Sequence, residues 1–196
     1  MSRKTRGFIL FLGALALLFA LLLTAWNLFD ADRAGKAANA VLGSLVENRT
    51  ENPGPEQTLP ESFRSLHSVE IDGREYVGVV EIPSLSLSLP VLRDWSYEGL
   101  KISPCRYSGS PYTNDLVICA HNYVSHFSAL RWIDMGVDVY FTTVTGESFR
   151  YVTVNRETLY PTEAERMKTA DGWSLTLFTC YTGGYSRCAI RCERAD

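Results

Sequence analysis

The sequence lacks several features that would place it in a common class of protein. It contains no internal repeat, which excludes the repeat architectures. It contains no C-x2-C pair, and the spacings of its cysteines and histidines match none of the usual structural zinc sites. We therefore expect no metal ion and no cofactor.

Acidic residues are absent from the N-terminal segment. Arg3, Lys4 and Arg6 give +3 over the first 29 residues, which hold no acidic residue, so a chain with net charge −3 carries −6 over the remainder. A mildly acidic domain is poorly suited to bind phosphates, so we expect no nucleic-acid partner. Hydrophobic residues make up 46% of the chain, which is enough for a packed core.

The segment from Gly7 to Phe29 contains no charged residue. About 20 helical residues cross a hydrocarbon core roughly 30 Å thick, and Trp26 lies near the outer end, where interfacial aromatics are common. We predict a transmembrane signal anchor at residues 7–29, with a cytoplasmic basic tail at 1–6 and the following domain outside the cell. A cleaved signal peptide is the alternative. This run, however, is longer than the apolar region of a signal peptide, which has about 7–15 residues, and no clear A-x-A cleavage site follows it.

The residues after the apolar run have two compositions. Residues 31–48 are rich in alanine with apolar residues at roughly helical spacing, which predicts a helix packed on the domain or held above the membrane. Residues 49–62 include three prolines and a glycine, which is typical of a linker. We therefore divide the chain into a helical stalk and linker at 30–60 and an extracellular catalytic domain at 61–196.

The domain reads as mainly β. Apolar residues alternate with polar ones, or form compact runs, between turn signals such as Asp72-Gly73 and Thr145-Gly146. The predicted strands lie at 77–82, 85–91, 114–121, within 137–160 on both sides of a turn, at 173–180 and at 186–192, with a short helical turn at 126–133. At least six short strands and few helices predict a closed barrel or a sandwich with mainly antiparallel pairing.

Five cysteines is an odd number, so at least one is unpaired unless it joins another chain. Cys180 ends the run "LTLFTC" and precedes a glycine-containing loop, which puts its sulfur at the rim of a sheet. In "SRCAIRC", strand alternation puts Cys188 and Cys192 on an apolar face, so we interpret both as core residues. Cys105 and Cys119 are either a disulfide or two buried thiols.

The chain has three histidines. His67 lies in a polar stretch and is interpreted as a surface residue, and His126 lies in a loop. His121 ends an apolar strand, where an imidazole suits a site at a barrel rim. A cysteine nucleophile needs a base and a donor for the oxyanion, so a Cys–His–Arg set could perform acyl transfer without a metal.

Four segments resemble sortases, the membrane-anchored cysteine transpeptidases of bacterial surfaces. "TLFTC" at 176–180 resembles the TLxTC signature, "AHNY" at 120–123 the histidine segment, "SRCAIRC" at 186–192 the last strand, and "VGVVEIPSLSLSLPV" at 77–91 the early strands. The order is the same, and the resemblance covers about residues 75–194. It implies a closed eight-stranded sortase-type β-barrel with short helices, preceded here by the transmembrane helix.

The resemblance also implies roles for individual residues. Cys180 would be the nucleophile that attacks an LPxTG-like sorting signal, His121 the general acid and base, and Arg187 the residue that stabilises the oxyanion. Thr179 and Asn122, beside the nucleophile and the base, are candidate substrate contacts. The implied partners are surface proteins bearing a C-terminal sorting signal and an amine of a peptidoglycan precursor or a pilin lysine, at the cell membrane.

The sequence departs from the family in its short loops and shows no clear acidic cluster of the calcium-binding kind found in some class A members, which favours a class B-like arrangement. Arg191 competes for the arginine role because it shares a strand face with Arg187. Two other functions stay open: a cysteine peptidase or amidase that acts on cell-wall or surface-protein peptides, and a non-catalytic, membrane-tethered β-domain that binds.

Overall fold

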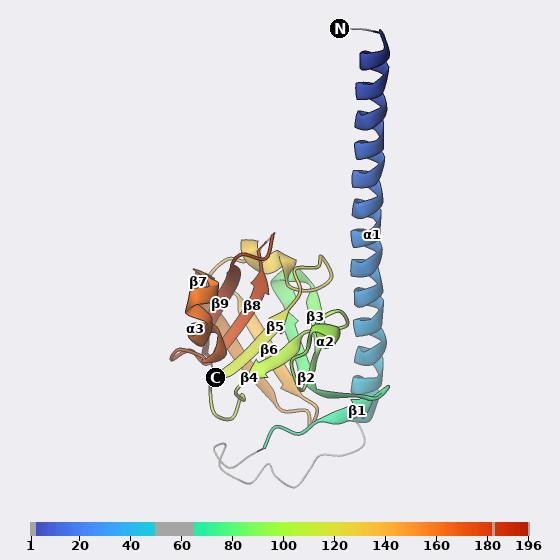
Figure 1. The fold of residues 1–196 in the computed structure, drawn as a ribbon. Helices are drawn as coiled ribbons and strands as arrows, with labels where there is room; N and C mark the ends of the chain where they lie inside the picture. Colours follow the sequence, from blue (N-terminus) through green and yellow to red (C-terminus); the bar gives the residue numbers. More distant parts are fainter. Residues whose placement is uncertain (1–2, 50–64, 182, 196) are drawn as a thin grey trace.

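The structure is a computed structural model that describes residues 3–49, 65–181 and 183–195. One long helix stands beside a small β-barrel (Figure 1). In chain order the elements are α1 (Arg3–Arg49), β1 (Val69–Ile71), β2 (Arg74–Ile82), η3 (Pro83–Leu85), β3 (Leu87–Leu92), α2 (Tyr97–Leu100), β4 (Cys105–Ser108), β5 (Leu116–Ala120), η4 (Ser128–Trp132), β6 (Asp138–Thr143), β7 (Ser148–Leu159), η5 (Pro161–Glu163), α3 (Ala164–Lys168), β8 (Leu175–Cys180) and β9 (Arg187–Arg194).

The barrel closes through eight strands, in the order β2-β3-β4-β5-β8-β9-β7-β6, with β6 pairing back onto β2. The short strand β1 extends β2 as a hairpin outside this circuit. Most pairs are antiparallel, but β3–β4 and β5–β8 are parallel. The predicted closed eight-stranded barrel with short helices is therefore confirmed, and the sandwich alternative is wrong.

Side chains from alternate positions fill two cores. The barrel interior holds residues such as Ile118, Phe141 and Ile190, while a second cluster lies between the outer face of the barrel and the helices. Because β5 is covered on both faces, all five of its residues are buried. This explains why the segment reads as a continuous apolar run and not as an alternating one.

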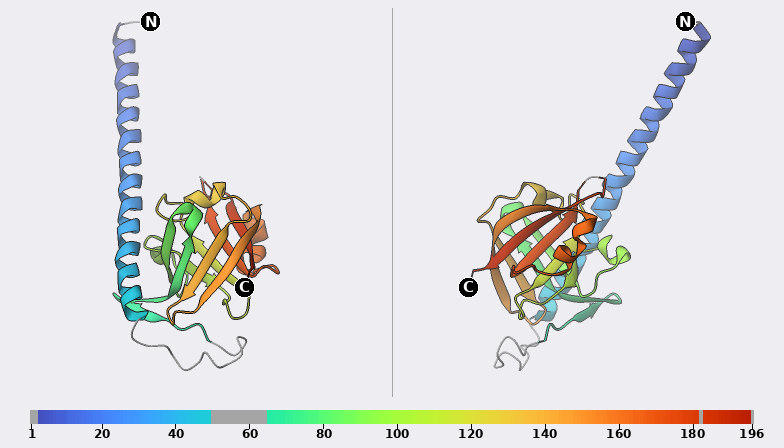
Figure 2. Two further views of the ribbon diagram at one scale, coloured as in Figure 1. Left: turned by 180° about the vertical axis from the view of Figure 1, so that it is seen from behind. Right: turned by 60° about the vertical axis from the view of Figure 1, so that its left-hand side comes forward.

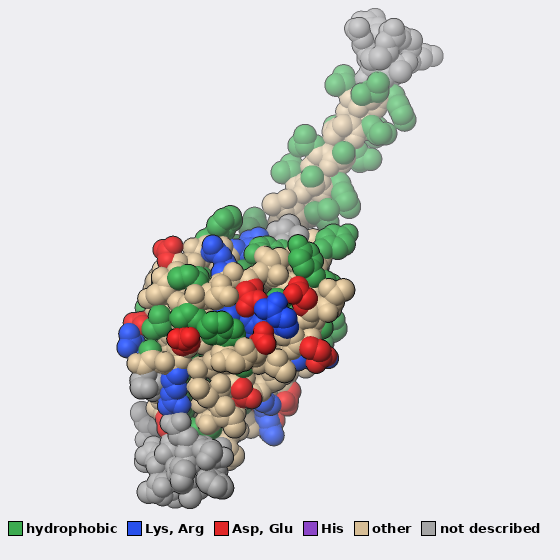
Figure 3. Space-filling model, turned by 90° about the vertical axis from the view of Figure 1, so that its left-hand side faces the viewer, with side chains coloured by type: hydrophobic (Ala, Val, Ile, Leu, Met, Phe, Trp, Pro, Cys, Tyr) green, Lys and Arg blue, Asp and Glu red, His purple; other side chains and the backbone are tan. Residues whose placement is uncertain are grey.

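The N-terminal helix is continuous where the sequence predicted two segments. Its first part projects beyond the barrel (Figure 2) and carries exposed apolar side chains (Figure 3). Residues Phe8–Leu45 contain a window with a mean hydropathy of 2.7, none of it buried. The second part packs on the barrel through Ala34, Ala38, Val41 and Leu45, whose spacing keeps them on one face of a helix. Of the linker predicted at 49–62, Arg49 is the last residue of α1, and the rest lies outside the described residues together with the predicted start of the domain at 61.

Most predicted elements are present. The two early strands break at Pro83, the helical turn is η4, and the hairpin around Thr145-Gly146 joins β6 to β7. The sequence did not predict β1, α2 or β4. Strand β4 has only four residues, and a register irregularity between Arg106 and Ser108 interrupts its pairing with β5. So short and irregular a strand leaves no periodic signal in the sequence.

Candidate active site

Three strand ends meet at one end of the barrel and bring the candidate residues together. Strands β5 and β8 run parallel, with Ala120 opposite Thr179, so His121 and Cys180 follow at adjacent positions. Strand β9 begins there, and Arg187 pairs directly with Cys180. Directly opposed residues in antiparallel strands have Cα atoms about 4.5–5.5 Å apart.

These residues line a pocket of about 240 Å³ on the outer face of the barrel. An aromatic wall borders it, in which Trp95 contacts Tyr107 at 5.8 Å and Tyr107 contacts Phe178 at 5.3 Å between ring centroids. The pocket therefore combines an apolar surface with a thiol, an imidazole and a guanidinium. A larger hollow of about 390 Å³, near Asp115 and Asp171, contains neither cysteine nor histidine.

Among the five cysteines, only Cys180 is partly exposed. Burial raises the pKa of Cys105 to about 11 and also raises the pKa values of Cys119, Cys188 and Cys192. All five thiols are free. Cys105 and Cys119 face each other across β4 and β5 as two buried thiols, which answers the disulfide question. Cys188 and Cys192 lie in the barrel interior, as strand parity predicts.

His121 is partly buried at the end of β5. Burial lowers its pKa, nearby Asp30 acts in the opposite direction, and Lys101 lowers it further. The imidazole packs on the ring of Tyr123, with centroids 4.8 Å apart and an interplanar angle of 34°. Of the other histidines, His67 is exposed as expected and His126 is fully buried.

Arg187 is anchored to the loop that joins β8 and β9. Its Nη1 donates to the carbonyl of Gly184 at 2.8 Å and to that of Ser186 at 3.3 Å. Its Nε and Nη2 make no hydrogen bond to any residue that the structure describes. A guanidinium held on one edge in this way still presents donors, and such donors can stabilise a developing oxyanion.

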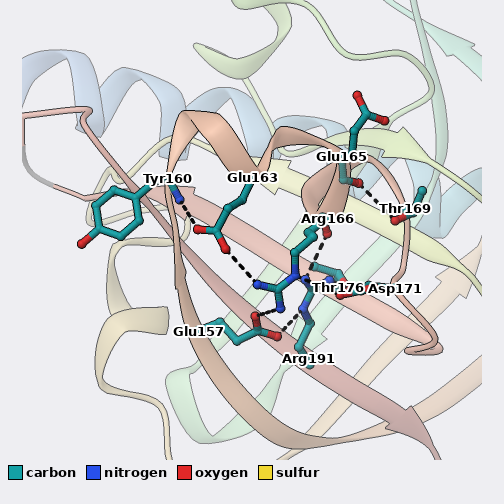
Figure 4. A network of polar contacts seen from close by, with 9 residues as sticks. All are labelled: Glu157, Tyr160, Glu163, Glu165, Arg166, Thr169, Asp171, Thr176 and Arg191. Atoms are coloured by element: carbon teal, nitrogen blue, oxygen red, sulfur yellow. Dashed lines mark hydrogen bonds and ion pairs between the residues drawn. The ribbon is translucent and has the colours of Figure 1, made fainter.

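Arg191 lies four residues further along the same face of β9 but is fully buried under α3. Its Nε donates to Glu157 at 3.0 Å, Nη1 to the Thr176 hydroxyl at 2.9 Å and Nη2 to the Arg166 carbonyl at 3.0 Å. Arg166 bonds Glu157 in turn, so one network ties α3 to β7 and β9 (Figure 4). All three guanidinium nitrogens of Arg191 are therefore hydrogen-bonded within the fold.

Thr179 lines the pocket, but its hydroxyl donates to the carbonyl of Ala120 at 2.9 Å, which ties β8 to β5. Asn122 follows His121 and lies outside the pocket lining. The sequence missed Tyr123, whose hydroxyl donates to Asp30 of α1 at 2.6 Å. The quoted "AHNY" contains this tyrosine, but no local signal pairs it with a residue 93 positions earlier.

Comparison with known proteins identifies the domain. Residues 80–195, more than half of the chain, match the family model of the sortase domain. No curated protein matches the sequence. Similar solved structures include sortase C1 from Streptococcus suis, 24% identical over 62% of this chain and 73% of that one, with a TM-score of 0.54. A sortase D5 transpeptidase from Clostridium perfringens is 13% identical over 84% and 99%, with a TM-score of 0.63. Sortase C from Clostridium perfringens, solved with a C-terminal cell wall sorting motif, is 20% identical over 80% and 90%, with a TM-score of 0.54.

Proposed function

The chain belongs to the sortase family, and on that basis we propose that it is a membrane-anchored cysteine transpeptidase that uses Cys180, His121 and Arg187. The observation that carries this proposal is the position of Cys180. It is the one partly exposed cysteine, it lies opposite Arg187 in register, and it shares a pocket with His121.

The reaction has two steps in this proposal. The Cys180 thiolate attacks the carbonyl carbon of the scissile peptide bond, and Arg187 donates hydrogen bonds to the oxyanion that forms. The C–N bond then breaks, and His121 gives its proton to the leaving amine. An acceptor amine next attacks the thioester, His121 takes up its proton, and the thiolate departs as the new amide forms.

The proposed substrate is a sorting signal of the LPxTG type. The aromatic wall of Trp95, Tyr107 and Phe178 offers apolar side chains of such a peptide a surface on which to pack. Sortase C from Clostridium perfringens was solved with a C-terminal cell wall sorting motif, which supports a peptide of this class. The acceptor in our proposal is an amine of a peptidoglycan precursor or a pilin lysine. Substrate contacts by Thr179 and Asn122, and a class B-like arrangement, remain predictions.

The proposed location is the cell membrane. The apolar first part of α1 spans the bilayer once, the basic residues before it face the cytoplasm, and the barrel lies outside. One apolar helix near the N-terminus agrees with this placement, and protease protection in oriented vesicles would test it.

The test incubates the full chain, in detergent micelles, with a panel of sorting-signal peptides, with and without an amine. Mass spectrometry should show an acyl adduct on Cys180, and a peptide–amine product when amine is present. The variant Cys180→Ala should form no adduct, whereas the matched variant Cys192→Ala should form it. Absence of any adduct with every peptide would overturn the proposal. An adduct that only hydrolyses, whatever amine is offered, would favour the peptidase or amidase function.

A further inference from the structure

The N-terminal helix contacts the loop that follows the candidate base. Tyr123 donates its hydroxyl hydrogen to Oδ2 of Asp30 at 2.6 Å. Ser125 donates to the carbonyl of Ala31, the next residue of α1, at 2.8 Å. Two consecutive helix positions therefore hold two nearby residues of one loop, which begins at His121.

Tyr123 links this contact to the candidate active site. Its ring packs on the imidazole of His121 with a centroid distance of 4.8 Å, and on its other neighbour, His126, at 5.5 Å. The ring can tilt about its own bonds unless its hydroxyl is fixed, and Asp30 fixes it. The orientation of the His121 imidazole is thereby coupled to a carboxylate on α1.

The charges around His121 come from several elements. Those that face it are Asp30 and its ion-pair partner Arg33 on α1, Lys101 after α2, His126 in its own loop, and Cys180 and Arg187 at the pocket. Asp30 is the acidic group in this set. Arg33 lies 2.8 Å from the Asp30 carboxylate and reduces its field without removing it.

We propose that Asp30 is a positioning residue for His121: it holds the imidazole in place through Tyr123, and its carboxylate charge acts on the imidazole directly. This inference rests on the proposed role of His121 as general acid. It makes the membrane anchor a part of the active site, because Asp30 comes directly after the apolar run that ends at Phe29.

The effect on protonation has a defined sign. Burial lowers the pKa of His121, and Asp30 opposes that effect. Loss of the carboxylate should therefore lower the pKa of His121 further. Release of the leaving amine requires protonated His121, so the high-pH limb of the acylation rate should move to lower pH by the same amount.

The experiment follows the imidazole signals of the full chain in detergent micelles by NMR, with ¹³C-labelled histidine. Asp30→Asn should shift the titration midpoint of His121 downward and leave that of His67 unchanged. Asp32→Asn is the matched control: it makes the same change two residues along, at a carboxylate that pairs with Lys36 at 2.6 Å and lies away from the loop. Asp30→Glu should restore most of the midpoint. An unchanged midpoint in Asp30→Asn would overturn the proposal.

A double variant tests the route through Tyr123. Tyr123→Phe keeps the ring and the Asp30 charge but removes the hydroxyl, so it should broaden the His121 signals as Asp30→Asn does while lowering the midpoint less. If Asp30 positions the imidazole through Tyr123, adding Tyr123→Phe to Asp30→Asn should broaden the His121 signals little beyond the single variant. Fully additive broadening would refute this route. The NMR readout needs no turnover, so a failure of the proposed transpeptidation would leave this test valid.

Discussion

Replacing each of the two arginines on the outer face of β9 by methionine should separate catalysis from stability. Arg191 is fully buried and donates three hydrogen bonds, whereas Arg187 lies at the pocket. Breaking a buried ion pair by removing one partner costs about 3–5 kcal/mol. Because Glu157 keeps its contact with Arg166, we expect Arg191→Met to reduce the free energy of unfolding by about 3 kcal/mol, the lower end of that range.

For a domain of this size, a loss of about 3 kcal/mol lowers the melting temperature by roughly 10 °C. Near-ultraviolet circular dichroism of the full chain in detergent would measure that change. Arg191→Met should still acylate Cys180 at 25 °C, since its side chain does not reach the pocket. Arg187→Met should melt close to the parent and lose roughly 10²–10³-fold in the acylation rate, as expected for a lost oxyanion donor.

The opposite pattern would refute the reasoning. If Arg191→Met were stable and inactive while Arg187→Met acylated normally, Arg191 would be the catalytic arginine and the buried network would be incidental. Arg191→Lys offers a milder check, because one ammonium group cannot replace three separate donors. We expect its melting temperature to lie between those of the parent and the methionine variant.

Three further predictions concern reactivity, packing and pH. In the folded protein, iodoacetamide should modify Cys180 alone, and in denaturant it should modify all 5 cysteines. Mass spectrometry would detect the modified residues, and early modification of Cys105 would contradict its burial. Gly78→Ala should destabilise the barrel by about 3 kcal/mol in denaturant unfolding, because the new Cβ would overlap the carbonyl oxygen of Thr142, where β6 closes the barrel. Burial lowers the pKa of His126 to about 4, so as pH falls this histidine becomes protonated in the unfolded chain before it does in the folded one. The free energy of unfolding should therefore decrease by about 3 kcal/mol between roughly pH 6.5 and pH 4, and His126→Phe should flatten this dependence.

The sequence could predict those parts of the molecule whose determinants are local. Strand parity in "SRCAIRC" correctly separated Cys188 and Cys192 from Arg187, because alternation along a strand needs no knowledge of its neighbours. The run before Cys180 predicted a strand, and the structure confirms it as β8. The roles of these residues in catalysis remain predictions.

Features that depend on distant contacts could not be predicted in this way. Asp30 and Tyr123 are 93 positions apart, and no periodicity links them. Arg191 could be distinguished from Arg187 only once α3 was seen to cover its end of the strand. The packed face of α1 had a signal, since Ala34, Ala38, Val41 and Leu45 recur at helical spacing, but alanines alone do not reveal which surface they cover.

The unbroken course of α1 has a consequence for reach. A helix rises 1.5 Å per residue, and the contact at Asp30 begins one residue after the apolar run ends. With that run placed across the bilayer as proposed, no flexible linker separates the membrane-spanning segment from the domain. The same continuous helix crosses the membrane and contacts the loop beside the pocket. The height of the thiol above the lipid is then a fixed property of the molecule. Inserting one helical turn after Phe29 would lift the pocket by about 5 Å, and a peptide presented from the membrane would need to be correspondingly longer.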